Sequence, residues 1–197
     1  MALLLTLLLV GCDRQSAVWH GHDLTGVMPD LAFSLVDDNG HAVTASDYAG
    51  KTVLLYFGFT HCEDVCPTTL ATLSRAVNAL GADSRRVRIL FVSVDPHRDT
   101  PAILQRYAEH FSPQVVALTG TRSQLDHLTR RYRVAYSYGN ADARGDYEVY
   151  HSSAIFVFDA RGKVRLLLQE QLGAAAITED LQRLLSDSER SYHHATK

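Results

Sequence analysis

The sequence is poor in features that would indicate several large classes of function. Its 19 basic and 22 acidic residues give a formal net charge of −3. It has no basic cluster with interleaved aromatic residues, so nucleic acid is not an expected partner. Internal repeats and low-complexity segments are absent, and the N-terminal apolar run is well short of the roughly 20 residues of a membrane-spanning helix. The 197 residues, 46% of them hydrophobic, suffice for one well-buried globular domain but not for a second full one.

The apolar run at residues 1–10 fits the core of a signal peptide. It leads into Leu9-Val10-Gly11-Cys12, which resembles the lipobox of bacterial lipoproteins, in which the cysteine is acylated and becomes the mature N-terminus. That resemblance implies lipidation of Cys12, and Asp13 occupies the position that favours retention in the inner membrane. No Lys or Arg precedes the run, so an uncleaved transmembrane anchor with an earlier start and an ordinary buried segment stay open as alternatives.

The sequence has three cysteines, and if Cys12 carries lipid, the other two are a potential pair in an oxidising compartment. Cys62 and Cys66 follow residues 53–59, an aliphatic and aromatic run typical of a strand buried on both faces. Pro67 is expected to open a helix, because the missing N–H of proline would have no intrahelical partner in a first turn. The two thiols therefore lie in a strand-to-helix loop, where helix-end N–H groups lower thiol pKa values.

The remaining pattern predicts alternating strands and helices. The run Asp37-Asp38-Asn39-Gly40 is expected to close an N-terminal β-hairpin, and Asp159-Ala160-Arg161-Gly162 a second hairpin late in the chain. This order predicts an α/β sandwich with a mixed central sheet. We expect strands at 87–94, 115–118, 152–158 and 164–168, helices at 67–80, 101–110, 121–132 and 177–185, and a polar loop at 138–146.

The segment after Cys12 lacks periodicity and contains two glycines, which indicates a mobile linker. A copper-binding tail built on Trp19, His20 and His22 is the alternative for this segment. The predicted division of the chain is a signal peptide or membrane anchor at 1–11, a tether at 12–26, a globular domain at 27–187 and a frayed tail at 188–197.

The spacing Cys-x-x-x-Cys allows more than one chemistry. With Cys66 in a first helical turn, residues four apart lie on one side of the helix, with Cα atoms near the roughly 4.4–6.8 Å window of a disulfide. Glu63 and Asp64 place carboxylates beside the thiols, which disfavours a thiolate in the free protein and favours a bound cation. Soft thiolates select Cu(I) or zinc, and a third imidazole ligand suits copper in both oxidation states. Spacing alone leaves a metal site, a reversible disulfide and a structural disulfide open.

The chain resembles the Sco/SenC family over roughly residues 20–185. The longest matching stretch, residues 56–70, reads Tyr-Phe-Gly-Phe-Thr-His-Cys-Glu-Asp-Val-Cys-Pro-Thr-Thr-Leu. The resemblance implies a thioredoxin-like three-layer sandwich, here with the N-terminal β-hairpin as an extension. It also implies a copper metallochaperone that helps to assemble the CuA centre of cytochrome c oxidase. The other matching stretches follow in order at residues 90–96, 98–101, 118–121 and 145–152.

Carried over position by position, the resemblance implies copper ligands at Cys62, Cys66 and His151. His151 stands just before the predicted strand 152–158, in a loop that a thioredoxin-like sheet brings against the cysteine turn. Thioredoxin-type reductases carry a cis-proline before that strand, and none of the five prolines stands there. The usual substrate-docking element of a reductase is therefore missing.

Two positions depart from the family pattern. Glu63 stands where the family usually has a proline, and this replacement is expected to loosen the loop and add charge. Tyr150 replaces the aspartate that commonly precedes the histidine. If that aspartate orients the imidazole, its loss affects redox tuning or partner docking but not the ligand set. Asp95 and Tyr150 are candidate supporting groups near the ligands, although turn formation before a proline explains Asp95 equally well. His61 is expected to point away from the metal.

The resemblance implies a metallochaperone rather than an enzyme. It would hand Cu(I) or Cu(II) to the oxidase subunit that carries the CuA site, or keep the thiols of that site reduced. Another copper chaperone or a thiol reductase would be a further partner. The expected location is the bacterial inner membrane, with a lipid or helix anchor and the domain in the periplasm.

The rival hypothesis is a thiol–disulfide oxidoreductase or redox sensor that uses Cys62 and Cys66 as its redox-active pair and stores no metal. A peroxiredoxin is a third option, but its Pro-x-x-x-Thr-x-x-Cys pattern is absent. Leu55 and Phe59 occupy the proline and threonine places of that pattern relative to Cys62.

Overall fold

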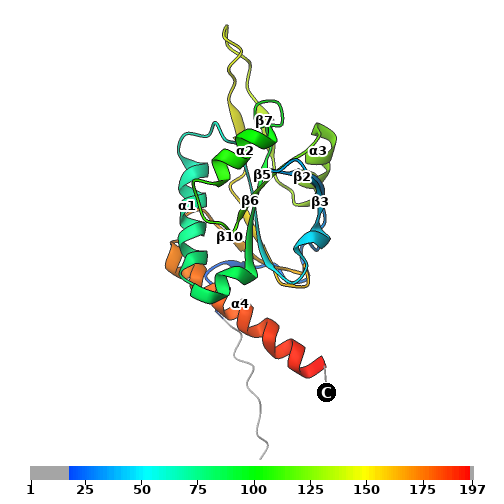
Figure 1. Ribbon diagram of the computed structural model, residues 1–197, viewed down its shortest axis with the longest axis vertical. Coiled ribbons are helices and arrows are strands. Elements are labelled where there is room, and N and C mark those ends of the chain that lie inside the picture. The colour runs from blue at the N-terminus through cyan, green and yellow to red at the C-terminus, as the bar shows by residue number, and fades with distance from the viewer. Residues whose placement is uncertain (1–17, 196–197) are drawn as a thin grey trace, which may run out of the picture.

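A computed structural model describes residues 18–195, and their side chains through residue 188. The expected signal peptide or anchor and Cys12 lie outside the described residues. The main sheet (Figure 1) has eight strands in the order β1-β10-β9-β4-β5-β6-β2-β3, and β7 pairs with β8 in a separate two-stranded sheet. The strands are β1 (His22–Asp23), β2 (Ser34–Asp37), β3 (Ala42–Thr44), β4 (Thr52–Gly58), β5 (Val87–Ser93), β6 (Val115–Thr119), β7 (Tyr136–Tyr138), β8 (Val149–His151), β9 (Ile155–Phe158) and β10 (Val164–Leu168).

The helices complete three layers around the main sheet. They are α1 (Val65–Asn78), α2 (Pro101–Ala108), α3 (Arg122–Arg131) and α4 (Ala174–Ala195), with short 3₁₀ turns η1 (Ala45–Tyr48) and η2 (Gly81–Arg86).

Side-chain contacts assign the helices to the two faces of this sheet. Tyr107 of α2 packs on Phe91, and Phe91 packs on Tyr56, its register partner in β4. Side chains alternate between faces along a strand, so the next residue of β4, Leu55, points to the other face with its register partner Phe156. Tyr132, directly after α3, stacks on Phe156 and therefore lies on that second face.

Helix α1 covers the same face as Tyr56, and α4 packs against α1. The hydroxyl of Thr178 in α4 donates to the main-chain oxygen of Ala76 in α1 across that contact. The predicted α/β sandwich with a mixed sheet is confirmed, because β4, β5 and β6 are parallel to one another while all other neighbouring strands of the main sheet pair antiparallel.

The centre of the sheet follows from the apolar runs in the sequence. All seven residues of β4 are buried, as expected for a parallel strand covered on both faces. The N-terminal hairpin β2–β3 is also confirmed. Its turn is held by the Asp37 carboxylate, which accepts the N–H groups of Asn39 and His41, and Gly40 takes the left-handed conformation with a φ of 81°.

The structure differs from the prediction at both ends of the domain. His22–Asp23, in the segment expected as a mobile linker, pairs with β10, and the N–H of Gly21 donates to Asp180 in α4. Helix α4 extends to Ala195, through most of the segment expected to be frayed. Within residues 18–195, no helix is both long enough and apolar enough to cross a membrane.

Candidate metal centre

The end of β4 makes room for a thiol. Gly58 is its last residue, and a Cβ placed there would lie 2.9 Å from the sulfur of Cys66 and 2.5 Å from the ring of Phe91. Real Cβ atoms do not approach heavy atoms this closely, so only glycine fits without moving the buried ring or the sulfur. The glycine in the cysteine motif therefore allows Cys66 to pack directly against the sheet.

Helix α1 begins at Val65 rather than at Pro67, so Cys66 lies in its first turn. Cys66 is fully buried, whereas Cys62 in the preceding loop is partly exposed, and both thiols are free. The main-chain N–H of Cys66 donates to the sulfur of Cys62 over 3.3 Å. The helix end thus supplies the expected N–H donor, and it is directed at Cys62.

The pKa of Cys66 differs from the expectation for a thiol at a helix end. Burial, together with a smaller effect of the neighbouring Cys62 thiol, raises the pKa of Cys66 to about 12. Desolvation of the thiolate therefore outweighs the backbone hydrogen bond from Phe59, which lowers the pKa of this thiol. In the metal-free reduced protein Cys66 is a neutral thiol at neutral pH, a poor starting state for a nucleophile.

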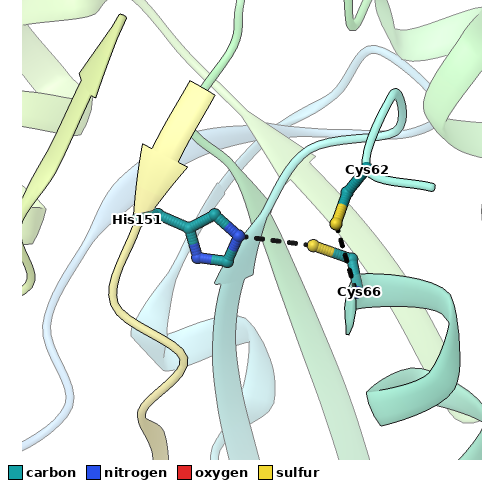
Figure 2. Close-up of side chains that lie close together, drawn as sticks. All are labelled: Cys62, Cys66 and His151. Atoms are coloured by element: carbon teal, nitrogen blue, oxygen red, sulfur yellow. Dashed lines mark hydrogen bonds between the residues drawn. The ribbon is translucent and has the colours of Figure 1, made fainter. Parts of the chain in front are cut away.

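His151 reaches the thiols from the last position of β8 (Figure 2). Its Nδ1 lies 3.0 Å from the main-chain oxygen of Ser152, which can only accept, so Nδ1 carries the proton. Nε2 keeps its lone pair and lies 3.4 Å from the Cys66 sulfur. Phe59 and Tyr56 flank the imidazole edge-on, with ring centroids 5.8 and 6.4 Å away.

The three predicted ligand residues therefore come together. The sulfurs of Cys62 and Cys66 and the ring nitrogen of His151 all lie within 4.8 Å of one another. Metal–sulfur bonds of about 2.3 Å allow two sulfurs on one ion to be at most about 4.6 Å apart, so the arrangement fits a shared metal to within a few tenths of an ångström. The described residues contain no other group of three or more Cys, His, Asp or Glu side chains this close together.

The other sequence candidates lie outside this cluster. The Asp95 carboxylate accepts hydrogen bonds from Tyr147, at 2.6 Å, and from Arg98, at 2.5 Å. Tyr150 is 60% exposed. In the part of the chain that the structure describes, no hydrogen bond joins Asp95 or Tyr150 to a ligand residue, and the main-chain oxygen of Ser152 orients the imidazole instead. The ring of His61 lies 3.7 Å from Asp99 and takes no part in the cluster.

Asp99 has a role that the sequence analysis missed. Its buried carboxylate accepts the N–H and the hydroxyl of Thr60, at 2.9 and 2.6 Å. It also accepts the hydroxyl of Ser93 at 2.5 Å. Since Thr60 is two residues before Cys62, Asp99 ties the cysteine loop to the end of β5. The only signal in the sequence was an aspartate just before the predicted helix.

The β7–β8 hairpin was also missed, because residues 138–146 were expected to form a loop. Tyr138 donates its hydroxyl to the main-chain oxygen of Val94, directly after β5, and Tyr147 donates to Asp95. The guanidinium of Arg98 lies 3.9 Å from the centre of the Tyr147 ring. These contacts dock the hairpin that carries His151 on the sheet end that carries the cysteine loop. The alternation of tyrosines at 136 and 138 was the available signal for a strand.

Comparison with known proteins agrees with this geometry. The SCO1/SenC family model matches residues 28–186. The bovine mitochondrial protein described as an SCO2 homolog is 40% identical over 172 residues, which cover 86% of this chain and 61% of the relative. The chain spans less than two thirds of the length of the curated relatives it matches.

Two solved structures with copper bound are similar to the chain. ScoI from Bradyrhizobium japonicum has a TM-score of 0.72 and 35% identity, over 79% of this chain and 98% of the other. Yeast Sco1 has a TM-score of 0.74 and 31% identity, over 80% of this chain and 90% of the other. The thioredoxin-like fold expected from the sequence is confirmed by these likenesses.

Proposed function

This chain belongs to the SCO1/SenC family, and from that membership together with the clustered Cys62, Cys66 and His151 we propose that it is a copper metallochaperone for the CuA centre of cytochrome c oxidase. The observation that carries the proposal is the convergence of two sulfurs and one imidazole nitrogen within 4.8 Å. The copper bound in the similar ScoI and Sco1 structures supports copper as the metal.

The donor set suits copper in both oxidation states. Two thiolates favour Cu(I), and an imidazole nitrogen makes Cu(II) acceptable as well. Binding requires both thiols to lose their protons, so copper competes with protons at the buried Cys66. The imidazole needs no such step, because Nε2 already presents its lone pair to the cluster.

The geometry fits transfer of copper by stepwise ligand exchange. Cys62 and His151 are partly exposed, whereas Cys66 is buried, so an incoming cysteine of the acceptor replaces Cys62 or His151 first and Cys66 last. Each acceptor thiol gives up one proton, and each departing sulfur takes one up. Burial favours the protonated form of Cys66, which helps the last step to completion. Val65 and Tyr150, 41% and 60% exposed, offer apolar contacts beside this opening.

Metal analysis of anaerobically reduced protein tests the proposal. The wild type is expected to bind one copper ion tightly, and Cys62→Ala and Cys66→Ala are each expected to lose tight binding. His151→Ala is expected to retain Cu(I) on the two thiolates and to lose most Cu(II) affinity, because the nitrogen ligand is gone. Tight copper binding of the wild type that is unchanged by His151→Ala in both oxidation states would remove His151 from the site.

A thiol–disulfide oxidoreductase or redox sensor is the second candidate. Two free thiols four residues apart favour it, but the raised pKa of Cys66 leaves little thiolate there to attack a disulfide. Turnover on disulfide substrates, feeble copper affinity and a reduction potential well above about −300 mV would together replace the copper proposal. Delivery of electrons to the acceptor's thiols is compatible with the same pair, and the metal analysis above distinguishes it from copper storage.

We further propose that the domain is held at the bacterial inner membrane and works in the periplasm, with the oxidase subunit carrying CuA as its partner. The support is the lipobox-like Leu9-Val10-Gly11-Cys12. Expression of the full chain with labelled fatty acid is expected to label the wild type and not Cys12→Ala. Wild-type protein that is membrane-bound but carries no labelled fatty acid would indicate a helical anchor instead.

A further inference from the structure

One buried hydroxyl beside the candidate metal centre has no role in the function proposed above. Tyr56 of β4 is fully buried, with its ring against Phe91 and edge-on to His151. Within the part of the chain that the structure describes, its hydroxyl makes no hydrogen bond of ordinary geometry, and its nearby polar groups are the side chains of Thr69 and Cys66. Buried polar groups are nearly always paired, so an unpaired hydroxyl at this place needs an explanation.

The hydroxyl lies on the Cys66 side of the sheet. Tyr56 and Gly58 are two residues apart in one strand and so point to the same face, and that face meets the Cys66 sulfur at Gly58. Burial raises the pKa of the Tyr56 hydroxyl above its usual range, and the neighbouring Cys66 raises it further. A tyrosine hydroxyl with its ordinary pKa of about 10 is already protonated at neutral pH, so Tyr56 can donate a hydrogen bond there.

The state of the sulfur decides whether this donor finds an acceptor. In the metal-free protein Cys66 is a neutral thiol hydrogen-bonded with Nε2 of His151, and a neutral sulfur is a weak acceptor. A metal-bound Cys66 is a thiolate, and charged acceptors form stronger hydrogen bonds. The pocket thus holds a donor that makes no hydrogen bond of ordinary geometry in the empty state, beside a sulfur that becomes a stronger acceptor when metal is bound.

We infer that Tyr56 is a positioning residue that donates a hydrogen bond to the Cys66 sulfur in the copper-loaded protein and thereby tunes the Cu(II)/Cu(I) balance. This inference rests on the proposed copper function. A hydrogen bond to a thiolate withdraws electron density from the sulfur, which weakens its donation to Cu(II) more than to Cu(I). Tyr56 would therefore shift the balance toward Cu(I), the form that thiol-to-thiol exchange carries.

The test compares Tyr56→Phe with Tyr107→Phe. Tyr107 is a matched control, because its hydroxyl is also buried without a partner and its ring also packs on Phe91. We expect all three proteins to bind one copper ion. Tyr56→Phe alone is expected to move the sulfur-to-Cu(II) charge-transfer band to lower energy. It is also expected to lower the ratio of Cu(I) to Cu(II) affinity by about tenfold, equivalent to 59 mV for a one-electron couple.

The outcomes separate this inference from the proposed function. Absence of copper binding by the wild type would overturn the metallochaperone proposal. Copper binding by all three proteins with the same band and potential in Tyr56→Phe as in the wild type would overturn the role of Tyr56 alone, as would equal shifts in Tyr107→Phe. If Tyr56→Phe fails to fold, 3,5-difluorotyrosine at position 56, a stronger donor of similar shape, is expected to move the potential in the opposite direction, and no movement would overturn the inference.

Discussion

The two cysteines and the histidine are held by different kinds of structure. Cys66 is fixed by the packed core, against Gly58 at the end of a fully buried strand, and Asp99 ties the loop before it. His151 belongs to the β7–β8 hairpin, whose strands pair only with each other among the described strands and which projects from the body of the molecule (Figure 1). The sulfur side is therefore rigid, while the nitrogen side depends on a few polar contacts and is the adjustable part of the site.

Gly58→Ala is expected to break the rigid side. The new methyl group has to displace the Phe91 ring or the Cys66 sulfur, and overpacking of this kind costs about 1–3 kcal/mol of the free energy of unfolding. Copper affinity should fall roughly 10- to 100-fold, the range seen when groups supporting metal ligands are altered. Denaturant unfolding and copper titration measure the two effects.

Gly173→Ala is the control for that prediction. No atom lies within 4 Å of a Cβ built at Gly173, so stability and copper affinity are expected to stay within error of the wild type. A Gly58→Ala protein that behaved like this control would show that the cysteine side is as adjustable as the histidine side.

Tyr147→Phe is expected to loosen the adjustable side. It removes one hydrogen bond to the buried Asp95 carboxylate and leaves the hairpin with the Tyr138 contact to the sheet end. The loss of one such bond is worth about 1 kcal/mol, so copper affinity should fall about fivefold while the stoichiometry stays at one. Tyr150→Phe, at an exposed position of the same hairpin, is the control and should bind copper like the wild type.

The same contact predicts a dependence on alkaline pH. Burial and the hydrogen bond to Asp95 raise the pKa of Tyr147 to about 12, above the value of about 10 in an unfolded chain. A raised pKa stabilises the protonated folded form, so this contribution is complete below about pH 10 and is lost as pH rises toward 12. Between pH 9 and pH 12, the midpoint temperature of thermal unfolding is expected to fall more for the wild type than for Tyr147→Phe. Parallel curves would mean that the hydroxyl does not hold the hairpin.

The smallest effect is expected from Tyr150→Asp, which restores the residue common in the family. The imidazole is already oriented by the main-chain oxygen of Ser152, and position 150 is exposed. We expect the free energy of copper binding to change by about 0.5 kcal/mol or less, as for other exposed charges. A tenfold change measured by competition with a copper chelator would show that the hairpin rearranges to use the new carboxylate.

The sequence predicted the rigid side well and the adjustable side poorly. The apolar run of β4 and the cysteine spacing carry strong local signals, because burial on two faces restricts the residues that fit. The β7 and β8 strands are only three residues each, so the alternation of Tyr136 and Tyr138 is shorter than the run of roughly four to eight residues that marks a strand. The predicted lowering of thiol pKa values at the helix end was wrong for Cys66, because its depth in the core depends on the absent side chain at Gly58.

Both ends of the described chain lie far from the candidate metal ligands Cys62, Cys66 and His151. Figure 1 shows α4 at one end of the long axis, and the β7–β8 hairpin at the other. His22–Asp23 pairs with β10, and this pairing fixes where the start of the described chain lies on the domain. An anchor upstream of residue 18 would hold the domain with the copper site facing away from the anchor. A second protein anchored to the same surface could then reach that site.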